Sequence, residues 1–155
     1  MSKHSKRQDA AARANSDPAL VARLKAAGLR PTRQRLALAQ SLFGSCDRHV
    51  TAEQLHGEAR AAGAHISLAT VYNTLHQFTA AGLLREVLVE PGRVYFDTNT
   101  GAHHHFYHED SGDIVDIAAN EVAFARLPTT PDGRVISAVD VVIRVRPNRT
   151  GAAGG

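Results

Sequence analysis

The sequence contains little cysteine and no long apolar run. Its one cysteine, Cys46, cannot form a disulfide within the chain, and it excludes a zinc site built on cysteine pairs. The apolar runs are a few residues long, far short of the roughly 20 residues that a membrane-spanning helix needs. The sequence lacks the pattern of a secretory signal, which is a basic start followed by an apolar stretch and a cleavage site. These absences predict a cytoplasmic protein without a membrane partner.

The chain has 155 residues, of which 43% are hydrophobic, enough to build one domain or two small ones. Its formal charge of +3 conceals an uneven distribution. Residues 1–90 hold twelve Lys or Arg and seven Asp or Glu, which gives +5, whereas residues 91–155 hold six and eight, which gives −2. The basic half predicts an anionic partner, and the asymmetry predicts two units with different functions.

Start and stop signals predict four short helices in the first half of the chain. Helix-starting residues at Asp17-Pro18, Pro31-Thr32, Thr51 and Ser67 are followed by the terminating residues Gly28, Gly44, Gly63 and Gly82. In the fourth helix Leu68, Val71, Leu75 and Phe78 form one predicted buried stripe. The strand-like runs 84–90 and 94–97 follow, joined by the turn Pro91-Gly92. This order is typical of a winged helix-turn-helix, with the fourth helix as the recognition helix.

Beyond residue 97 the pattern changes to short strands. We expect strands at 103–109, 113–117 and 135–145, with a short helix at 120–127. The predicted organisation is a disordered basic arm (1–16), a winged-helix DNA-binding domain (17–97), a small C-terminal α/β domain (98–147) and a flexible tail (148–155). The predicted fold class is α+β.

Polar side chains on the fourth helix favour nucleic-acid binding. Thr70, Tyr72 and Asn73 lie off the apolar stripe, and Asn is suited to adenine whereas Thr and Tyr can meet thymine methyls or phosphates. Arg30, just before the second helix, can hold a phosphate or enter a minor groove. The alternatives are a solvated helix face or a protein-docking module.

A histidine cluster indicates metal ligation in the acidic half. On a strand, His103 and His105 point to one face and His104 to the other. Asp116 lies on the next predicted strand, and Asp97 ends the preceding one. Imidazole and carboxylate suit zinc, iron or manganese. The alternatives are an inert polar strand, in which case the chain is a DNA binder without an effector, or a metal-dependent hydrolase using the His103, His105 and Asp116 cluster.

Several motifs, matching in order and spacing, resemble the ferric uptake regulator (Fur) family. They are GLRPTRQRLALAQSLF, DRHVTAEQLH, ISLATVYNTLHQFTAAGLL, the YFD that ends the wing, and HHHFYHEDSGDIVDI. The HHHFYHED variant is most similar to the iron response regulator (Irr) branch. The resemblance implies a homodimeric transcriptional regulator of iron homeostasis, not an enzyme, which binds a palindromic, AT-rich double-stranded DNA operator. It also makes the C-terminal domain the dimerisation and effector-sensing domain.

The resemblance assigns functional residues that the pattern alone does not. It implies a regulatory divalent-metal site between the two domains, with His49, Asp97, His103, His105 and Asp116 as ligands; His49 is not identifiable from the histidine cluster. It implies DNA contacts by Arg30, Ser67, Thr70, Tyr72 and Asn73. In the Irr branch the triple histidine is associated with haem, so His103, His104 and His105 are candidate haem-binding residues.

The chain departs from the family pattern at two places. The structural zinc of many members is held by two cysteine pairs; here His108 and Ser111 replace the first pair and no second pair exists, so that zinc is not expected. Many relatives carry Arg where this chain has Asn73. Because Arg prefers guanine and Asn prefers adenine, the operator should differ from theirs.

Overall fold

The computed structural model describes residues 17–149, which form two compact units. The N-terminal unit is residues 1–100 and the C-terminal unit is residues 101–155. The predicted basic arm (1–16) lies outside the described residues, as do residues 150–155 of the predicted tail. Among the residues described, no helix has the length and apolar character needed to cross a membrane.

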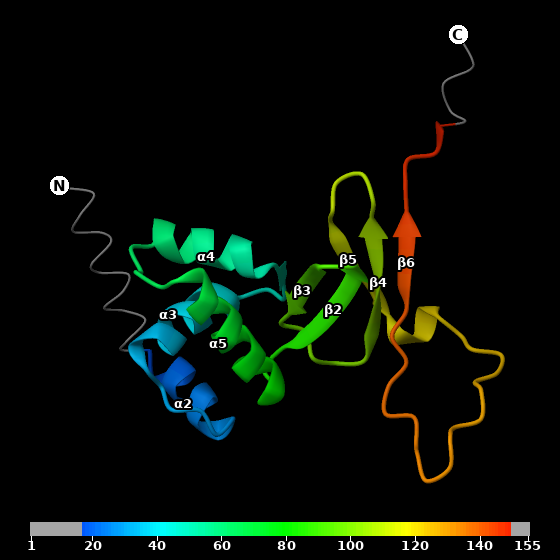
Figure 1. Ribbon diagram of the computed structural model, residues 1–155, viewed down its shortest axis with the longest axis horizontal. Coiled ribbons are helices and arrows are strands. Elements are labelled where there is room, and N and C mark those ends of the chain that lie inside the picture. Colours follow the sequence, from blue (N-terminus) through cyan, green and yellow to red (C-terminus); the bar gives the residue numbers. More distant parts are fainter. Residues whose placement is uncertain (1–16, 150–155) are drawn as a thin grey trace. The chain divides into compact units, whose positions relative to one another are not determined.

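From residue 17 to residue 80, the described part of the N-terminal unit contains the four predicted helices (Figure 1). Their bounds are α2 (Pro18–Ala26), α3 (Arg33–Leu42), α4 (Ala52–Ala61) and α5 (Leu68–Ala80). Each starts after a side chain that accepts a backbone N–H of its first turn: Asp17, Thr32, Thr51 and Ser67. At α4 the acceptance is reciprocal, because the Gln54 side chain also accepts the Thr51 N–H at 2.9 Å.

Helix α5 anchors the core of this unit. Val71, Leu75 and Phe78 are fully buried against the other helices. Leu68 was predicted on the same stripe, and this is wrong, because its side chain is 36% exposed. It is the first helical residue, where the core no longer extends beneath the helix, and the buried Thr74 contributes to the core face instead.

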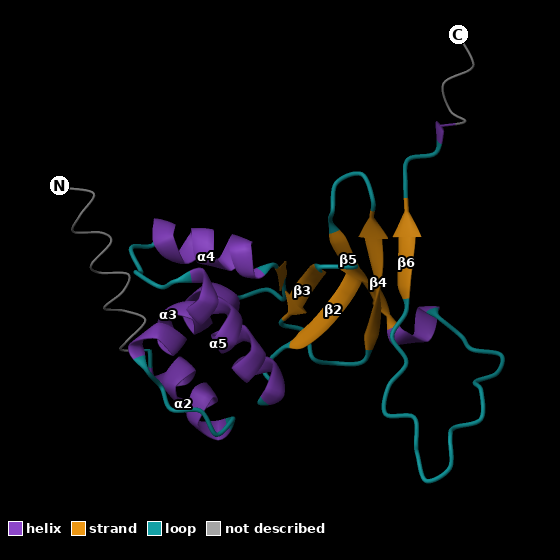
Figure 2. Ribbon diagram, in the orientation of Figure 1, coloured by secondary structure: helices purple, strands orange, loops and turns teal. Residues whose placement is uncertain are grey.

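A three-stranded antiparallel sheet completes the N-terminal unit, with strand order β1-β3-β2 (Figure 2). Strands β2 (Arg85–Glu90) and β3 (Arg93–Asp97) are the predicted hairpin, turning at Gly92 with φ +77°. Strand β1 (His49–Val50) was not predicted, since two residues carry no periodicity. It pairs His49 with Asp97 and Val50 with Phe96, which brings a histidine beside the last residue of the hairpin.

The C-terminal unit contains a second sheet, with strand order β5-β4-β6. Strand β4 (His103–His108) is antiparallel to β5 (Ile114–Ala118) and parallel to β6 (Val142–Val145). The helix predicted at 120–127 is wrong, because only a 3-10 turn at Ala119–Glu121 forms. The strand predicted from residue 135 begins at Val142, and Val135 is 89% exposed. β-Branched residues favour a strand only where neighbours pack against them, which these exposed residues lack.

The burial difference along α5 predicts different costs for two leucine truncations. Leu75→Ala should lower the free energy of unfolding by about 2–5 kcal/mol, because it leaves a cavity in the core. Leu68→Ala, in the same helix, should cost less than about 1 kcal/mol. Urea unfolding followed by circular dichroism measures both, and equal losses would contradict the core described above.

Candidate functional site

A histidine and a carboxylate lie side by side at the edge of the N-terminal sheet. We call His49 and Asp97 the N-terminal pair. Their β1–β3 register places the two residues opposite each other, with His49 Nε2 3.1 Å from Asp97 Oδ2. The Asp97 side chain is fully buried, and its Oδ1 accepts the Asn99 N–H at 2.9 Å. Burial of an ionised carboxylate is costly unless it is hydrogen-bonded and paired with a positive charge, such as a protonated imidazole or a bound cation.

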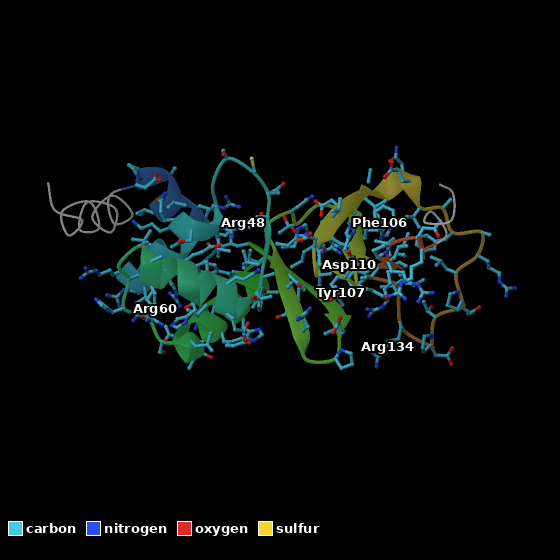
Figure 3. The ribbon with its side chains drawn as sticks, turned by 90° about the horizontal axis from the view of Figure 1, so that it is seen from above. Arg48, Arg60, Phe106, Tyr107, Asp110 and Arg134 are labelled. Carbon is cyan, nitrogen blue, oxygen red and sulfur yellow. The ribbon has the colours of Figure 1, made fainter. Side chains whose placement is uncertain are left out.

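The residue before His49 is Arg48 (labelled in Figure 3), whose hydrogen bonds hold this segment in place. The Arg48 guanidinium makes two hydrogen bonds to the Glu58 carboxylate of α4, at 2.7 and 3.0 Å, and a third to the Ser41 carbonyl. Its backbone N–H donates to Thr98 Oγ1 at 2.9 Å, and its carbonyl accepts the Thr98 N–H at 3.1 Å. The position of His49 is therefore determined by both α4 and the end of the hairpin.

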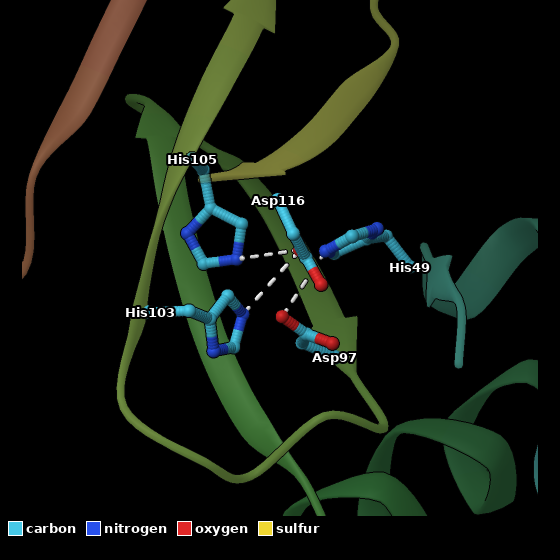
Figure 4. Close-up of side chains that lie close together, drawn as sticks. All are labelled: His49, Asp97, His103, His105 and Asp116. Carbon is cyan, nitrogen blue, oxygen red and sulfur yellow. Dashed lines mark ion pairs between the residues drawn. The ribbon is translucent and has the colours of Figure 1, made fainter. Parts of the chain in front are cut away.

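Two histidines and a carboxylate come together in the C-terminal unit. We call His103, His105 and Asp116 the C-terminal trio. The β4–β5 register sets His105 opposite Asp116, and His103, two residues earlier, lies on the same face of β4. The Nε2 atoms of His103 and His105 lie 3.4 and 3.5 Å from Asp116 Oδ1 (Figure 4). Each residue of the trio offers one ligand atom, all within 4.8 Å of one another.

The hydrogen bond of the His103 ring indicates which of its two nitrogens is available to a cation. Its Nδ1 lies 2.6 Å from the Gly101 carbonyl, which can only accept, so Nδ1 carries the hydrogen. In the neutral ring, Nε2 then presents a lone pair toward the Asp116 carboxylate. Two acceptors facing each other require a proton or a metal ion between them, and a carbonyl on the second nitrogen is the usual partner of a metal-bound histidine.

His104 lies on the other face of β4 and has different partners. Its Nδ1 accepts the Val141 N–H at 3.3 Å, and its ring stands edge-on to Phe124 with centroids 5.9 Å apart. All three consecutive histidines are buried, with 6%, 6% and 2% exposure along the chain. Sequence alternation predicted the two faces, but it could not identify Val141 and Phe124, because both belong to segments whose predicted structure does not form.

The predicted DNA-contacting residues lie in the N-terminal unit. Arg30 and Asn73 are exposed, and Asn73 lies on the outer face of α5. Ser67 is the N-cap of α5: it accepts the Thr70 N–H at 3.1 Å and donates its hydroxyl hydrogen to Thr70 Oγ1 at 2.9 Å. The half-buried Tyr72 donates its hydroxyl hydrogen to Glu53 at 2.6 Å.

Helices α4 and α5 followed by a hairpin define the N-terminal unit as a winged helix-turn-helix, a class of DNA-binding proteins. Residues 26–129 match the sequence model of the ferric uptake regulator family. The chain therefore belongs to the ferric uptake regulator family. It is a metal-responsive transcriptional regulator and not an enzyme, which removes the hydrolase hypothesis.

Individual relatives agree with this assignment. The chain is 34% identical over 100 residues to the ferric uptake regulation protein of Pseudomonas aeruginosa, covering 64% of this chain and 75% of that protein. It is 36% identical over 96 residues to the peroxide-responsive repressor PerR of Staphylococcus aureus, covering 62% and 64%. The structure of the Pseudomonas aeruginosa ferric uptake regulator with manganese superimposes with a TM-score of 0.65 at 28% identity, covering 84% of this chain and 98% of that one. The Vibrio cholerae regulator, at 24% identity and a TM-score of 0.64 over 82% and 98%, shares the fold.

The separate role of His104 predicts a local effect of its removal. His104→Ala leaves the Val141 N–H without its acceptor, which should speed hydrogen exchange of that amide by roughly fivefold or more, the factor for about 1 kcal/mol. Amide exchange followed by NMR measures this. His108→Ala on the same strand is the control, since the Val141 amide does not bond to it; an unchanged Val141 rate in His104→Ala would contradict the assigned contact.

Proposed function

We propose that this regulator controls DNA binding through one divalent metal ion held jointly by His49, Asp97, His103, His105 and Asp116. The observation that carries the proposal is that a carboxylate lies beside imidazole in both units: the buried Asp97 beside His49, and Asp116 beside the buried His103 and His105. The N-terminal pair supplies two donors and the C-terminal trio three, and neither alone matches the four or more ligands that such ions commonly take. Nitrogen and oxygen donors without thiolate suit iron, manganese or zinc.

Sharing of the five proposed ligands between the two units connects metal binding to DNA binding. Because the five donors belong to both units, the ion binds best in the arrangements that let all of them reach it. Binding of the ion then shifts the population of the protein toward those arrangements. The size of the shift is set by how much more tightly they bind the ion than the other arrangements do. In a homodimer, the arrangement of the units sets the distance between the two recognition helices, which must match the operator half-sites.

The DNA-binding proposal assigns separate roles to two kinds of side chain. Asn73, exposed on α5, reads a base, whereas Arg30 contributes charge to phosphate or minor-groove binding. Ser67 and Thr70 hold the first turn of α5 through their mutual hydrogen bonds and approach the backbone of the DNA. The proposed partner is a palindromic, AT-rich duplex; the two-fold symmetry of a homodimer accounts for the palindrome.

Haem has weaker support than a metal ion as the effector. An axial ligand must present a ring nitrogen to a large planar group. The three histidines are buried; His104 Nδ1 is bonded to Val141, and the Nε2 atoms of His103 and His105 face Asp116. Haem binding by His103, His104 or His105 would require β4 to open. The haem response and the iron response regulator branch stay predictions.

Metal stoichiometry tests the shared site. We expect one Mn²⁺ or Zn²⁺ per chain by equilibrium dialysis. His49→Ala and His103→Ala should each weaken this binding by more than about tenfold, since the loss of even a second-shell partner costs that much. His65→Ala, which removes an exposed histidine of the N-terminal unit, is the matched control. Two ions per chain, or full binding in His49→Ala, would show that the trio works alone.

Two substitutions separate base reading from phosphate binding. An operator is first selected from random duplexes with the metal-loaded protein. Asn73→Ala should weaken binding to that operator by about 1–3 kcal/mol and relax preference at one position. Arg30→Ala should weaken all duplexes alike and reduce the salt slope by about 1. Fluorescence anisotropy over a salt series measures both. Failure to select any sequence, with or without metal, would contradict the proposed function.

A further inference from the structure

Glu53 places a negative charge on the helix-turn-helix. It stands in the first turn of α4, the helix that precedes the recognition helix, and its side chain is exposed. A carboxylate on a helix-turn-helix repels DNA phosphates and so weakens binding to any duplex. The group that the Glu53 carboxylate contacts therefore indicates what role this charge has.

That group belongs to the recognition-helix residue Tyr72. The Tyr72 hydroxyl donates to Glu53 Oε1 at 2.6 Å, a short, charge-assisted hydrogen bond that joins α4 to α5. The bond lowers the pKa of the Glu53 carboxyl, helped by a backbone hydrogen bond within the same residue. The same bond, with smaller effects of burial and of the Glu53 charge, raises the pKa of the Tyr72 phenol. Both directions show that ionised Glu53 and protonated Tyr72 stabilise each other.

The ring of Tyr72 has a second neighbour along α5. His76 stacks against it, with centroids 6.4 Å apart and planes inclined by 22°. His76 is in turn tied to the wing, because its Nδ1 lies 2.9 Å from Glu86 Oε1 of β2 and its ring stands edge-on to Phe96 of β3. The Tyr72 side chain is therefore fixed at its hydroxyl by α4 and along its ring by a residue bonded to the wing.

We propose that Glu53 is a positioning residue for specific DNA recognition, which fixes the Tyr72 ring in the rotamer that contacts a base. The proposal rests on the proposed function, since it refines how the recognition helix reads its operator. With the hydroxyl bonded to Glu53, Tyr72 meets the DNA through its ring, as a thymine methyl requires. A side chain already fixed in its bound rotamer loses less entropy on binding. The repulsion between the Glu53 charge and DNA phosphates applies to operator and non-cognate duplexes alike, so it does not contribute to this specificity.

The test measures a specificity ratio, the affinity for the selected operator divided by that for a scrambled duplex, by anisotropy with full-length metal-loaded protein. Glu53→Ala should lower this ratio about fivefold, because the freed Tyr72 side chain must then be ordered when it binds the operator. Glu53→Gln, whose amide oxygen still accepts from the phenol, should keep the ratio within about twofold of wild type. Glu53→Asp keeps the charge but is too short to reach Tyr72, and it should behave like alanine.

The Tyr72→Phe background separates positioning from simple charge repulsion. There the hydroxyl is absent, so Glu53→Ala should no longer change the specificity ratio. If Glu53→Ala, Glu53→Gln and Glu53→Asp leave the ratio at the wild-type value, or if Glu53→Ala has the same effect with and without the Tyr72 hydroxyl, the positioning role is overturned while the regulator assignment stands. A wild-type protein that does not distinguish operator from scrambled DNA would overturn both.

Discussion

A fully buried carboxylate at the end of the wing is the constraint on which the effector chemistry depends. Asp97 ends β3 with a fully buried side chain, where an ionised carboxylate is stable only with hydrogen bonds or an opposite charge beside it. The two-residue strand β1 places His49 opposite this carboxylate, and Arg48 holds the strand in place. The arrangement puts a pair of metal-compatible donors where the N-terminal unit ends.

The C-terminal unit presents the same chemistry in a different sheet. His103 and His105, two positions apart on β4, meet the Asp116 carboxylate on β5, while the intervening His104 faces Val141 and Phe124. The alternation of a strand thus divides three consecutive histidines into two donors and one structural residue. That division supports a metal ion rather than haem as the proposed effector, and it leaves the sensing function without any need for cysteine.

Much of the N-terminal fold could be predicted from local signals. Helix caps at Asp17, Thr32, Thr51 and Ser67 fixed where α2 to α5 begin, and Pro91-Gly92 marked the wing turn. Leu68 and the segments at 120–127 and 135–141 were predicted wrongly for one shared reason. Propensity and periodicity describe what a segment favours, whereas burial depends on what packs against it, and these residues are exposed.

Contacts between residues far apart in the chain could not be predicted from local sequence patterns. His49 was reached through family resemblance, because β1 is too short for any periodicity, and its partner lies far along the chain. The bond between Tyr72 and Glu53 joins two helices across 19 residues, and each residue by itself is consistent with a solvated helix face. Among the proposed metal ligands, those on β4 and β5 could be predicted from a pattern, because strand alternation and a hairpin turn place them near one another.

The central claim is that metal and DNA binding are coupled through the two units, and thermodynamic reciprocity tests it most directly. Operator affinity is measured with metal-free and Mn²⁺-loaded protein, and Mn²⁺ affinity is measured with and without operator. The account predicts that both ratios depart from one by the same factor, about fivefold or more. Equal operator affinities with and without bound Mn²⁺ would contradict it, because the metal ion would then have no preference among the arrangements of the chain.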